Sequence, residues 1–367
     1  MNNTKEMFYI NSQIIQTPDP ANPGKVIKTY PLTIEKTNIP ELKPDEYLMK
    51  VAALGLNRAE IVQKKGFYPP PPGASAILGL EAVGRIVDPE TLEPINILTT
   101  ANTSNDQSPL FGTIVGGGSY AQYMAVKKAN LLQMPENLTL EQNAAIPEAW
   151  FTAFQLLWEV AKIQEGDWVY IPAAASGVGL AAIQLVKQCF GGRVIASCGS
   201  EDKKIFCEKF GPDYVINYKD PAMTPEKIQE VILEKTGGKG ISVCLDCVGP
   251  SSWGLYSNVL AMDARLVVFG YLGGMGCTDT SLLGKLVFKR ISILGTNIRT
   301  RDVEYKSKVI NMFNSLAVPK FQDGTMQPNV HIKYNLDLTN PEHGKLMAEG
   351  HRVMEANENI GKIIFEF

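Results

Sequence analysis

The sequence predicts an α/β protein of two domains, in which a β-rich domain is followed by a doubly wound parallel sheet of six strands. Its 367 residues favour two domains, at roughly 150 residues per domain. Over the first 145 residues, short apolar stretches are separated by Pro and Gly. Beyond residue 166, short apolar runs alternate with helical stretches, which is typical of a parallel sheet with helices on both faces.

In the first domain, the apolar stretches at residues 47–54 and 77–87 are the clearest candidate strands. Residues 68–73 (YPPPPG) must form a loop of restricted conformation, because proline fixes φ and has no N–H to donate. Residues 101–109 (ANTSNDQSP) have the composition of a solvated loop. The glycines at 116–118 then precede a candidate strand, SYAQYMAV.

The second domain begins with a helix predicted over residues 147–161, whose apolar residues follow a period of 3.6. Six strands are predicted after it: DWVYIP (167–172), RVIAS (193–197), DYVINY (213–218), ISVCLD (241–246), ARLVVFG (264–270) and ISILGTN (291–297). Helices are expected from Val178, from Asp202, over 226–235 and over 252–260. The last segments read as strand (329–334), helix (341–356) and strand (361–367), and we expect this tail to return to the first domain.

The composition excludes several classes of function. A net charge of −3 does not suit a nucleic-acid-binding surface or a polybasic membrane anchor. No window approaches the roughly 18 consecutive apolar residues of a transmembrane helix. Six cysteines without even spacing suit a reducing compartment, and the first residues lack a signal-peptide core. The expected location is therefore the cytoplasm, with the mitochondrion, reached without a cleaved presequence, as the alternative.

A turn of small residues joins the first of the six strands to its helix. The strand at 167–172 runs directly into AAASGVG (173–179), and such a turn lets the backbone approach a pyrophosphate at the helix N-terminus. Against the fingerprint Gly-x-Gly-x-x-Gly, Ala174 and Ser176 replace the first two glycines and only Gly179 remains. The turn predicts dinucleotide binding, while close packing of helix on sheet would explain the same residues.

The second strand should end near the adenosine ribose, where NAD-binding folds usually have an acidic residue. Here Ser200 follows the strand and Lys203 comes three residues later, a hydroxyl and a cation that suit the 2′-phosphate of NADPH. Glu201 and Asp202 would repel that phosphate if they pointed inward. Alternatively, Lys203 is simply an exposed residue of the helix.

The residues that could hold a metal are few and poorly placed. The three histidines, His331, His343 and His351, all fall in the last tenth of the chain. Between residues 88 and 115 there is no Cys or His, which excludes a four-cysteine zinc lobe there. The CxxC pair Cys244 and Cys247 spans the end of a predicted core strand, so we interpret both as structural cysteines. Zinc-assisted chemistry is therefore disfavoured, and no metal is predicted.

Five segments together resemble a known family: residues 55–86 (GLNRAEIVQKKGFYPPPPGASAILGLEAVGRI), 144–157 (AAIPEAWFTAFQLL), 173–185 (AAASGVGLAAIQL), 198–204 (CGSEDKK) and 357–367 (NENIGKIIFEF). The sequence resembles the zinc-independent, zeta-crystallin-like quinone oxidoreductases of the medium-chain dehydrogenase/reductase superfamily. Where zinc enzymes of the superfamily have a Cys ligand and a Gly-His-Glu motif, this chain has Leu56-Asn57-Arg58 and Gly79-Leu80-Glu81. The resemblance implies a GroES-like catalytic domain at 1–145, completed by 315–367, and a Rossmann domain at 146–314.

The resemblance also implies a set of site residues that bind NADPH and a substrate. The expected cofactor-binding residues are Ser176, Gly177, Val178 and Gly179 at the pyrophosphate, Ser200 and Lys203 at the 2′-phosphate, Tyr218 at the adenine, Cys247, Val248 and Gly249 on the adenosine side, Phe269, Gly270 and Tyr271 under the nicotinamide, and Asn359 closing the site. On the substrate side, Asn57 and Tyr68 are the matching polar residues of the cleft and the expected catalytic pair.

In this family the reaction is hydride transfer from the nicotinamide to an electron-poor quinone or enone. Tyr68 could donate a hydrogen bond to the developing oxyanion or relay a proton. Each expected catalytic residue also has a structural interpretation, Tyr68 as a loop residue packed on prolines and Asn57 as a strand-end residue bonded to backbone. A related activity, the reduction of enoyl thioesters, would need a pocket for an acyl carrier arm. The sequence has no basic patch near the cleft that would indicate such a pocket.

Two departures from the family support a different class of function. Relatives follow the strand that ends at residue 86 with a Val-Gly-Asp-Arg-Val segment, which is missing from residues 88–115. The chain also has an N-terminal extension of about 15 residues compared with family members, which gives room for a partner contact. A catalytically inactive accessory subunit of a larger, mitochondrial assembly is therefore the alternative. The family usually pairs through its last Rossmann strand, so we expect a homodimer through residues 291–297.

Overall fold

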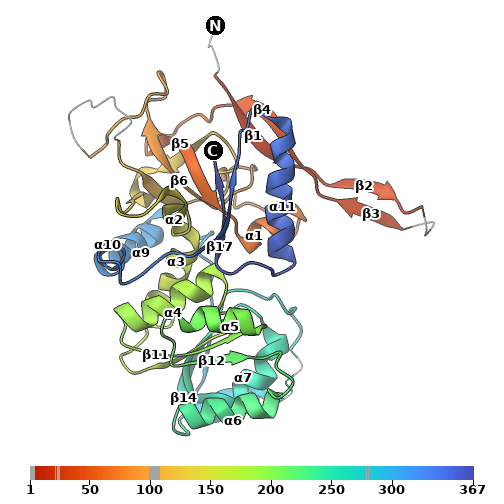
Figure 1. Cartoon of the computed structure of the whole chain (residues 1–367), viewed down its shortest axis with the longest axis vertical. Helices are drawn as coiled ribbons and strands as arrows, with labels where there is room; N and C mark the ends of the chain where they lie inside the picture. Colours follow the sequence, from red (N-terminus) through yellow and green to blue (C-terminus); the bar gives the residue numbers. More distant parts are fainter. Residues whose placement is uncertain (1–4, 21, 23–24, 99–107, 278, 280) are drawn as a thin grey trace. The chain divides into compact units, whose positions relative to one another are not determined.

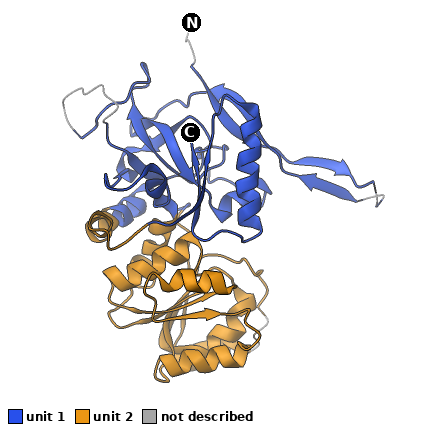
Figure 2. Ribbon diagram, in the orientation of Figure 1, with its two compact units in different colours: residues 1–148, 299–310, 328–367 blue, residues 149–298, 311–327 orange. Residues whose placement is uncertain are grey.

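The computed structural model describes residues 5–20, 22, 25–98, 108–277, 279 and 281–367. The chain forms two compact units (Figure 2): unit 1 contains residues 1–148, 299–310 and 328–367, and unit 2 contains residues 149–298 and 311–327. Of the loop predicted at 101–109, only Ser108 and Pro109 lie within the described residues. These two units are defined by which residues pack together. The domains expected from the sequence, 1–145 with 315–367 and 146–314, remain a prediction.

Unit 1 is rich in strands, as the Pro and Gly punctuation predicts. Its strands are β1 (Glu6–Ser12), β2 (Ile15–Pro18), β3 (Val26–Thr29), β4 (Leu32–Asn38), β5 (Glu46–Gly55), β6 (Glu81–Val87), β7 (Phe111–Ile114), β8 (Tyr123–Lys127), β9 (Leu132–Gln133), β16 (Val330–Asn335) and β17 (Lys362–Glu366). Its helices are α1 (Arg58–Lys64), η1 (Lys128–Asn130), α2 (Leu140–Ala144), η4 (Pro341–His343) and α11 (Gly344–Glu355). The helices α3 (Pro147–Phe154) and α9 (Val303–Leu316) each cross a limit between the units.

One seven-stranded sheet organises unit 1, in the order β16-β17-β5-β6-β7-β9, with β8 also paired to β5. The C-terminal strand β17 runs antiparallel to β5, with Phe365 opposite Leu54. This pairing brings the end of the chain beside a strand some 300 residues earlier in the sequence. Separate pairs are formed by β1 with β4 and by β2 with β3, and the hairpin of β2 and β3 extends away from the rest of unit 1 (Figure 1).

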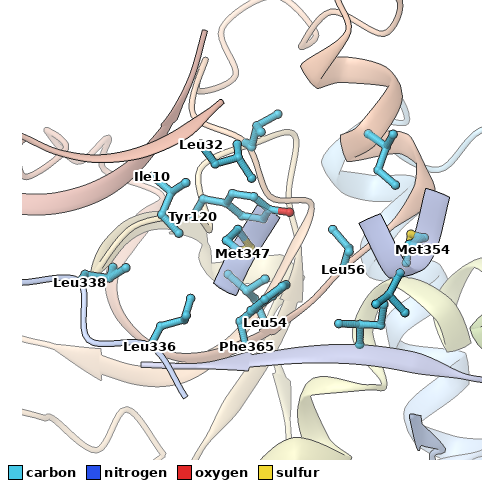
Figure 3. Packing of buried hydrophobic residues seen from close by; sticks show 14 residues of the cluster. Ile10, Leu32, Leu54, Leu56, Tyr120, Leu336, Leu338, Met347, Met354 and Phe365 are labelled. Carbon is cyan, nitrogen blue, oxygen red and sulfur yellow. The ribbon is translucent and has the colours of Figure 1, made fainter. Parts of the chain in front are cut away.

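The core of unit 1 joins the two ends of the chain. Its buried apolar side chains come from β1, β4, β5, α11 and β17 and from the segment before β8, and they meet in one cluster (Figure 3). Leu54, Leu56 and Phe365 are fully buried there, and Met347 contributes from α11. Because burying such side chains is worth about 1.5–3 kcal/mol each, the C-terminal tail is an integral part of this unit.

Unit 2 is the predicted doubly wound sheet. Its strands are β10 (Trp168–Ile171), β11 (Arg193–Cys198), β12 (Tyr214–Asn217), β13 (Ile241–Asp246), β14 (Leu260–Val268) and β15 (Ser292–Gly295). Its other elements are η2 (Gln155–Val160), α4 (Gly177–Cys189), α5 (Glu201–Glu208), α6 (Pro225–Lys235), η3 (Pro250–Ser252), α7 (Trp253–Val259), α8 (Leu282–Lys289) and α10 (Val318–Gln322). All strands are parallel, in the order β12-β11-β10-β13-β14-β15, which confirms the fold class.

One helix differs from the sequence-based expectation. The helix predicted over 147–161 is α-helical only to Phe154 and continues as the π-helix η2. In the part of the chain that the structure describes, no helix combines the length and the apolar character needed to cross a membrane.

Candidate functional site

The turn between β10 and α4 in unit 2 forms a helix N-terminus with donors that the helix cannot satisfy. Ser176 is the N-cap of α4, and its Oγ accepts a hydrogen bond from Gly179 N at 3.1 Å. The N–H groups of Gly177 and Val178 belong to the first turn, where no intrahelical acceptor exists, so they are available to an anion. A Cβ on Gly179 would lie 2.5 Å from Ala174 O, so only glycine allows the helix to approach the strand this closely.

The ends of β11 and β12 bring together three of the residues expected at the 2′-phosphate and the adenine. Tyr218 N donates to Cys198 O at 3.0 Å, and a Cβ on Gly199 would lie 2.8 Å from the Tyr218 hydroxyl. Ser200 is the N-cap of α5 and accepts from Lys203 N at 3.3 Å. The pKa of Cys198 is lowered, first by a hydrogen bond with Cys207 and further by the positive charge of Lys203, so this ammonium acts at the same strand end.

The acidic residues after Ser200 are both exposed and lie at the start of α5. Glu201 pairs with Lys204 at 3.0 Å, and its second carboxylate oxygen lies 3.5 Å from Asn217 Nδ2 at the end of β12. The ion pair offsets the charge of Glu201. The structure therefore gives this carboxylate a partner within the helix, which weakens the repulsion that the sequence suggests.

The ends of β13 and β14 are packed against each other. Asp246, fully buried at the end of β13, accepts hydrogen bonds from Val248 N at 2.8 Å and Gly249 N at 2.9 Å. Leu272 N donates to Cys247 O at 3.1 Å, and a Cβ on Gly270 would lie 2.9 Å from the same oxygen. The expected segments 247–249 and 269–271 thus lie side by side at one edge of the sheet.

These observations fit a dinucleotide at the carboxyl edge of the unit 2 sheet. The strand order reverses between β10 and β13, and open α/β sheets bind their ligands at such a switch point. The unsatisfied N–H groups of α4 lie directly after β10 and suit a pyrophosphate. The hydroxyl of Ser200 and the ammonium of Lys203 lie after the next strand of the sheet, where a ribose phosphate would be held.

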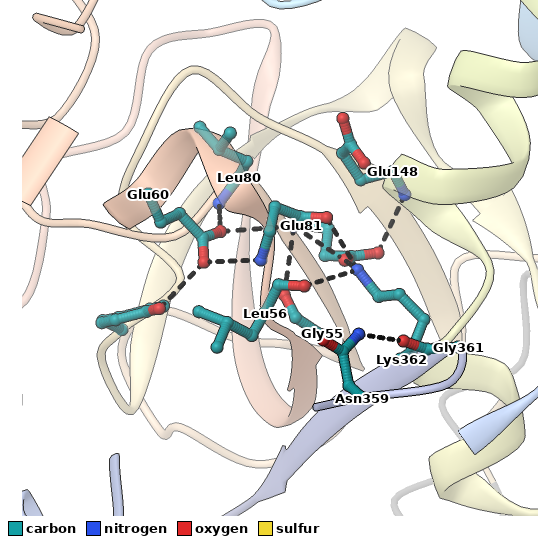
Figure 4. Close-up of polar contacts among 11 residues, drawn as sticks. Gly55, Leu56, Glu60, Leu80, Glu81, Glu148, Asn359, Gly361 and Lys362 are labelled. Atoms are coloured by element: carbon teal, nitrogen blue, oxygen red, sulfur yellow. Dashed lines mark hydrogen bonds and ion pairs between the residues drawn. The ribbon is translucent and has the colours of Figure 1, made fainter. Parts of the chain in front are cut away.

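In unit 1, Asn57 belongs to a buried polar network, of which Glu60, Glu81 and Lys362 are labelled in Figure 4. Its Nδ2 donates to Glu81 Oε1 at 2.9 Å and to Gly55 O at 3.1 Å, and its Oδ1 accepts from Lys362 Nζ at 2.7 Å. Lys362 and Glu81 form an ion pair of 2.5 Å in which the side chains are only 5% and 0% exposed. The amide of Asn57 is therefore held in one orientation by protein groups on both sides.

A second arm of this network runs from Asn57 to His351. Glu60 is fully buried, and burial raises the pKa of its carboxyl group. Tyr120 donates to Glu60 Oε2 at 2.8 Å, and its hydroxyl lies 3.0 Å from His351 Nε2. Burial, together with the charges of Lys64 and Lys65, lowers the pKa of His351 to about 3, so its imidazole is neutral at physiological pH.

Tyr68 begins the proline-rich loop of unit 1 and is in contact with a buried cation. The guanidinium of Arg299 lies over the Tyr68 ring, 4.7 Å from its centroid. Arg299 also donates to Tyr68 O at 3.3 Å and to Gly116 O at 2.6 Å. The side chain of Tyr68 is half-buried.

Asn359, expected to close the nucleotide site, lies in unit 1 and donates to Gly361 O at 2.7 Å. It caps the turn that leads to Lys362 and β17 (Figure 4). The structure thus brings the expected residues of unit 2 together at one edge of its sheet. In unit 1, Asn57 and Asn359 contact the network and the turn before β17, whereas Tyr68 contacts Arg299. Their catalytic and cofactor-binding roles remain predictions.

The segments Leu56-Asn57-Arg58 and Gly79-Leu80-Glu81, which stand where zinc enzymes have a Cys ligand and a Gly-His-Glu motif, contain neither Cys nor His. Leu56 and Leu80 are buried, and Lys362 Nζ donates to Leu56 O at 3.0 Å as well as to Glu81. Among the described residues, no group of three or more His, Cys, Asp or Glu side chains is placed to hold a metal. The ammonium of Lys362 here neutralises Glu81.

Sequence reasoning missed five polar residues of unit 1, namely Glu60, Tyr120, Arg299, His351 and Lys362. One of them had a local signal, because Asn57 and Glu60 have the spacing of a capping box, and the structure contains that box. The others had none: they come from segments far apart in the chain, and each residue type is common on protein surfaces.

Comparison with known proteins assigns both parts of the chain to one superfamily. The family model described as "Alcohol dehydrogenase GroES-like domain" matches residues 43–136, and the one described as "Zinc-binding dehydrogenase" matches residues 177–315. Quinone oxidoreductase-like protein 2 of Mus musculus is 27% identical over 316 residues, which cover 84% of each chain. Quinone oxidoreductase of Mus musculus is 25% identical over 305 residues, covering 83% of this chain and 86% of the relative.

Solved structures of similar fold include several oxidoreductases. An NAD-dependent alcohol dehydrogenase, 27% identical, superposes with a TM-score of 0.71 over 92% of this chain and 96% of the other. A mycobacterial protein solved with NADPH has a TM-score of 0.74 and 19% identity, covering 98% of this chain and all of the other. The JamJ enoyl reductase has a TM-score of 0.72 and 21% identity, covering 98% and 99%.

The fold and these matches define an oxidoreductase built from a GroES-like domain and a Rossmann-type parallel sheet. The chain belongs to the medium-chain dehydrogenase/reductase superfamily, and its matches are consistent with the zinc-independent, quinone oxidoreductase-like members.

Proposed function

We propose that this oxidoreductase reduces quinones or electron-poor enones by hydride transfer from NADPH, without zinc. The observation that carries the proposal is the group of residues at the end of β11, where Ser200 and Lys203 stand in the place that an acidic residue takes in NAD-binding folds. The quinone oxidoreductases among its relatives and the fold shared with a protein solved with NADPH support the same assignment.

The cofactor would be held by residues of unit 2. The N–H groups of Gly177 and Val178 and the hydroxyl of Ser176 would bind the pyrophosphate, and Ser200 and Lys203 the 2′-phosphate. Tyr218 would cover the adenine, the segment 247–249 the adenosine, and the segment 269–271 the nicotinamide. Asn359 would close the site. When bound, NADPH supplies the hydride from its nicotinamide ring.

Tyr68 and Asn57 are the side chains that we assign to the substrate. The hydroxyl of Tyr68 would donate a hydrogen bond to the substrate oxygen on which negative charge develops. Asn57 would act with its amide already oriented by Glu81 and Lys362. The remaining contribution of the protein is to position the reacting rings and to exclude water.

The first test is a fluorescence titration with NADPH and, separately, NADH, read as energy transfer from the four tryptophans to the nicotinamide. Saturable binding that prefers NADPH by about tenfold or more supports the reductase, since tenfold corresponds to about 1.4 kcal/mol. Substrate profiling then decides the class, because ortho-quinones should be reduced and crotonyl thioesters should not. The opposite ranking would make the chain an enoyl-thioester reductase.

Lys203→Ala should weaken NADPH binding by about 1.5–3 kcal/mol, as expected for loss of a hydrogen bond to a charged group, and should leave NADH binding nearly unchanged. The matched control is Lys204→Ala, because the neighbouring Lys204 is paired with Glu201. Equal losses for both nucleotides in Lys203→Ala would show that the 2′-phosphate lies elsewhere.

The accessory-subunit alternative makes a different prediction from the reductase. We place the enzyme in the cytoplasm and expect nucleotide binding by the isolated chain. A folded protein that binds neither nucleotide would instead support an inactive subunit of a larger, mitochondrial assembly. Affinity isolation from the native source would then be needed to find its partners.

We further propose that the chain forms a homodimer through residues 291–297. Within the described chain, β15 is at the edge of the unit 2 sheet and pairs only with β14, so its other side has free backbone donors and acceptors. The neighbouring helix α8 exposes Leu283, Val287 and Phe288, each at least 75% exposed. Thr296 N donates to Val268 O of β14, so the alternate residue Leu294 also faces β14, whereas Ile293 faces the free side. Ile293→Pro should therefore remove a donor from the free side and yield monomers on gel filtration, and Phe288→Glu should do the same without altering the strand. An unchanged dimer in both variants would contradict this interface.

A further inference from the structure

Arg299 is a buried arginine of unit 1 for which the proposed function has so far given no role. It is 4% exposed and begins the segment 299–310, which belongs to unit 1. Its Nε and one terminal nitrogen donate to Gly116 O at 2.9 and 2.6 Å, and its other contacts are with Gln63 Oε1 at 2.7 Å and Tyr68 O at 3.3 Å. The side chain thus joins helix α1, the proline-rich loop and the glycines before β8.

The charge of Arg299 is balanced by neutral acceptors. The hydrogen bonds to Gly116 O, Tyr68 O and Gln63 Oε1 all go to amide oxygens, and the Tyr68 side chain is a further neutral hydrogen-bond partner. Burial lowers the pKa of Arg299, and the side chains of Tyr68 and Glu60 act in the opposite direction. A guanidinium remains protonated under these conditions, so a positive charge persists in a region of low dielectric. Such a charge exerts a stronger potential on nearby atoms than an exposed one would.

The loop that begins at Tyr68 depends on this contact for its position. Residues 69–72 are all proline and offer no backbone N–H, so the loop has few hydrogen bonds of its own, among them Ala74 N to Pro71 O at 3.0 Å. Arg299 supplies what the prolines lack, because it holds the Tyr68 carbonyl and covers the Tyr68 ring. The guanidinium makes four hydrogen bonds to these three oxygens, one more than the three donors of a lysine ammonium allow, and its flat face stacks on the aromatic ring.

We propose that Arg299 is the positioning residue for Tyr68, which it holds so that the phenol hydroxyl meets the substrate oxygen in a positive potential. This inference rests on the proposed function, in which Tyr68 donates a hydrogen bond to that oxygen. It extends the proposal by naming the residue that fixes the donor and favours negative charge beside it. The substrate class that benefits is an electron-poor carbonyl compound whose oxygen gains charge during reduction.

The test of coupling is a double-mutant cycle on kcat with NADPH and an ortho-quinone. Tyr68→Phe keeps the ring under the guanidinium and removes only the hydroxyl, and should lower kcat about 100-fold. Arg299→Gln should lower kcat by a similar factor in the wild-type background and by less than about twofold in the Tyr68→Phe background, because residues that act as a unit are not additive. Arg299→Lys, which keeps the charge without the fork of donors, should give an intermediate kcat. The KM for NADPH should stay unchanged throughout.

The matched control is Arg301→Gln, since Arg301 lies over the Tyr305 ring at 4.4 Å in the same segment. Hydrogen exchange of the amides at residues 66–68 and 74 gives a readout that does not need activity: exchange should be faster in Arg299→Gln and unchanged in Arg301→Gln. An equal loss of kcat in both backgrounds, or unchanged exchange in Arg299→Gln, overturns the inference. A wild-type protein that binds NADPH but reduces no quinone or enone refutes the proposed function and the role of Arg299 in it, and faster exchange would then leave Arg299 as a loop anchor only.

Discussion

The carboxyl edge of the unit 2 sheet, where we propose that the nucleotide binds, and the polar network of unit 1 are built in opposite ways. At the edge, each group comes from a short segment that follows one strand, and most of the donors are backbone N–H groups or N-cap hydroxyls. In the network, the groups are side chains of residues as far apart in the chain as Asn57 and Lys362. The first kind of site therefore needs only local sequence and a parallel sheet, whereas the second exists only once both ends of the chain have come together.

The two regions also treat charge differently. The sheet edge combines the unsatisfied N–H groups in the first turn of α4 with the Lys203 ammonium, and the acidic residues beside them, Glu201 and Asp202, are exposed. The network instead encloses an ion pair and the carboxyl group of Glu60. An open positive edge suits a mobile anionic ligand, while enclosed charges suit a fixed scaffold.

The largest difference between the two regions should follow from removing one charge from the network of unit 1. Lys362→Met leaves Glu81 buried without its cation and should lower the free energy of unfolding by about 3–5 kcal/mol, measured by urea denaturation. Adding Glu81→Gln should recover part of that loss, because the remaining buried charge is then gone as well.

A matched control for this prediction is the exposed pair of Arg290 and Asp263, whose side chains are 61% and 63% exposed. Arg290→Met should lower the free energy of unfolding far less than Lys362→Met does, since solvent screens the exposed pair. If Lys362→Met cost no more than Arg290→Met, the network would not be the scaffold described above.

The next effect concerns the backbone-built edge. Gly179→Ala would place a methyl group 2.5 Å from Ala174 O, so α4 must move away from β10. The expected cost is up to about 3 kcal/mol of stability, with weaker binding of NADPH and NADH alike, because the pyrophosphate contacts are common to both. The stability and nucleotide affinity of Gly179→Ala are compared with those of Gly177→Ala, in the same turn. An unchanged nucleotide affinity in Gly179→Ala would argue against the turn as the pyrophosphate site.

A smaller effect is the dependence of protein stability on pH, which should arise from the buried His351 of the network. Burial lowers the pKa of His351 to about 3, below its value of 6.5 in an unfolded chain, so the unfolded state binds more protons between these two values. Stability should therefore fall as the pH falls through this window, by about 2 kcal/mol at pH 5 relative to pH 8 from His351 alone. Glu60, whose pKa is raised, acts in the opposite direction, so the comparison is between the wild type and His351→Gln.

Thermal or urea unfolding at the two pH values is the measurement. His351→Gln should lose this part of the pH dependence, whereas His343→Gln, on the surface segment before α11, should keep it. Identical pH dependence in the wild type and in His351→Gln would show that folding does not lower the pKa of His351.

Elements that depend on neighbouring residues could be predicted from the sequence, whereas those that depend on distant segments could not. The six strands of unit 2 and the helices α4 to α7 lie close to their predicted limits, although β14 begins four residues early, because period and turn residues are local signals. The helices α8 and α10 were not predicted. The turn at 173–179 was found for the same reason. The π-helical continuation at 155–160 was not foreseen, since apolar spacing does not distinguish it from an α-helix.

By itself, the sequence determined the fold class, the turn of small residues at 173–179 and the hydroxyl and lysine that follow β11, because each depends on residues next to one another in the chain. Only the tertiary structure decided that Lys362 neutralises Glu81, that Tyr120 joins Glu60 to His351, and that Arg299 holds Tyr68. A lysine, a histidine or an arginine in the sequence has no assigned partner. The fold supplies the partner, because a charge that is removed from water must be matched by the polar groups that the folded chain places beside it.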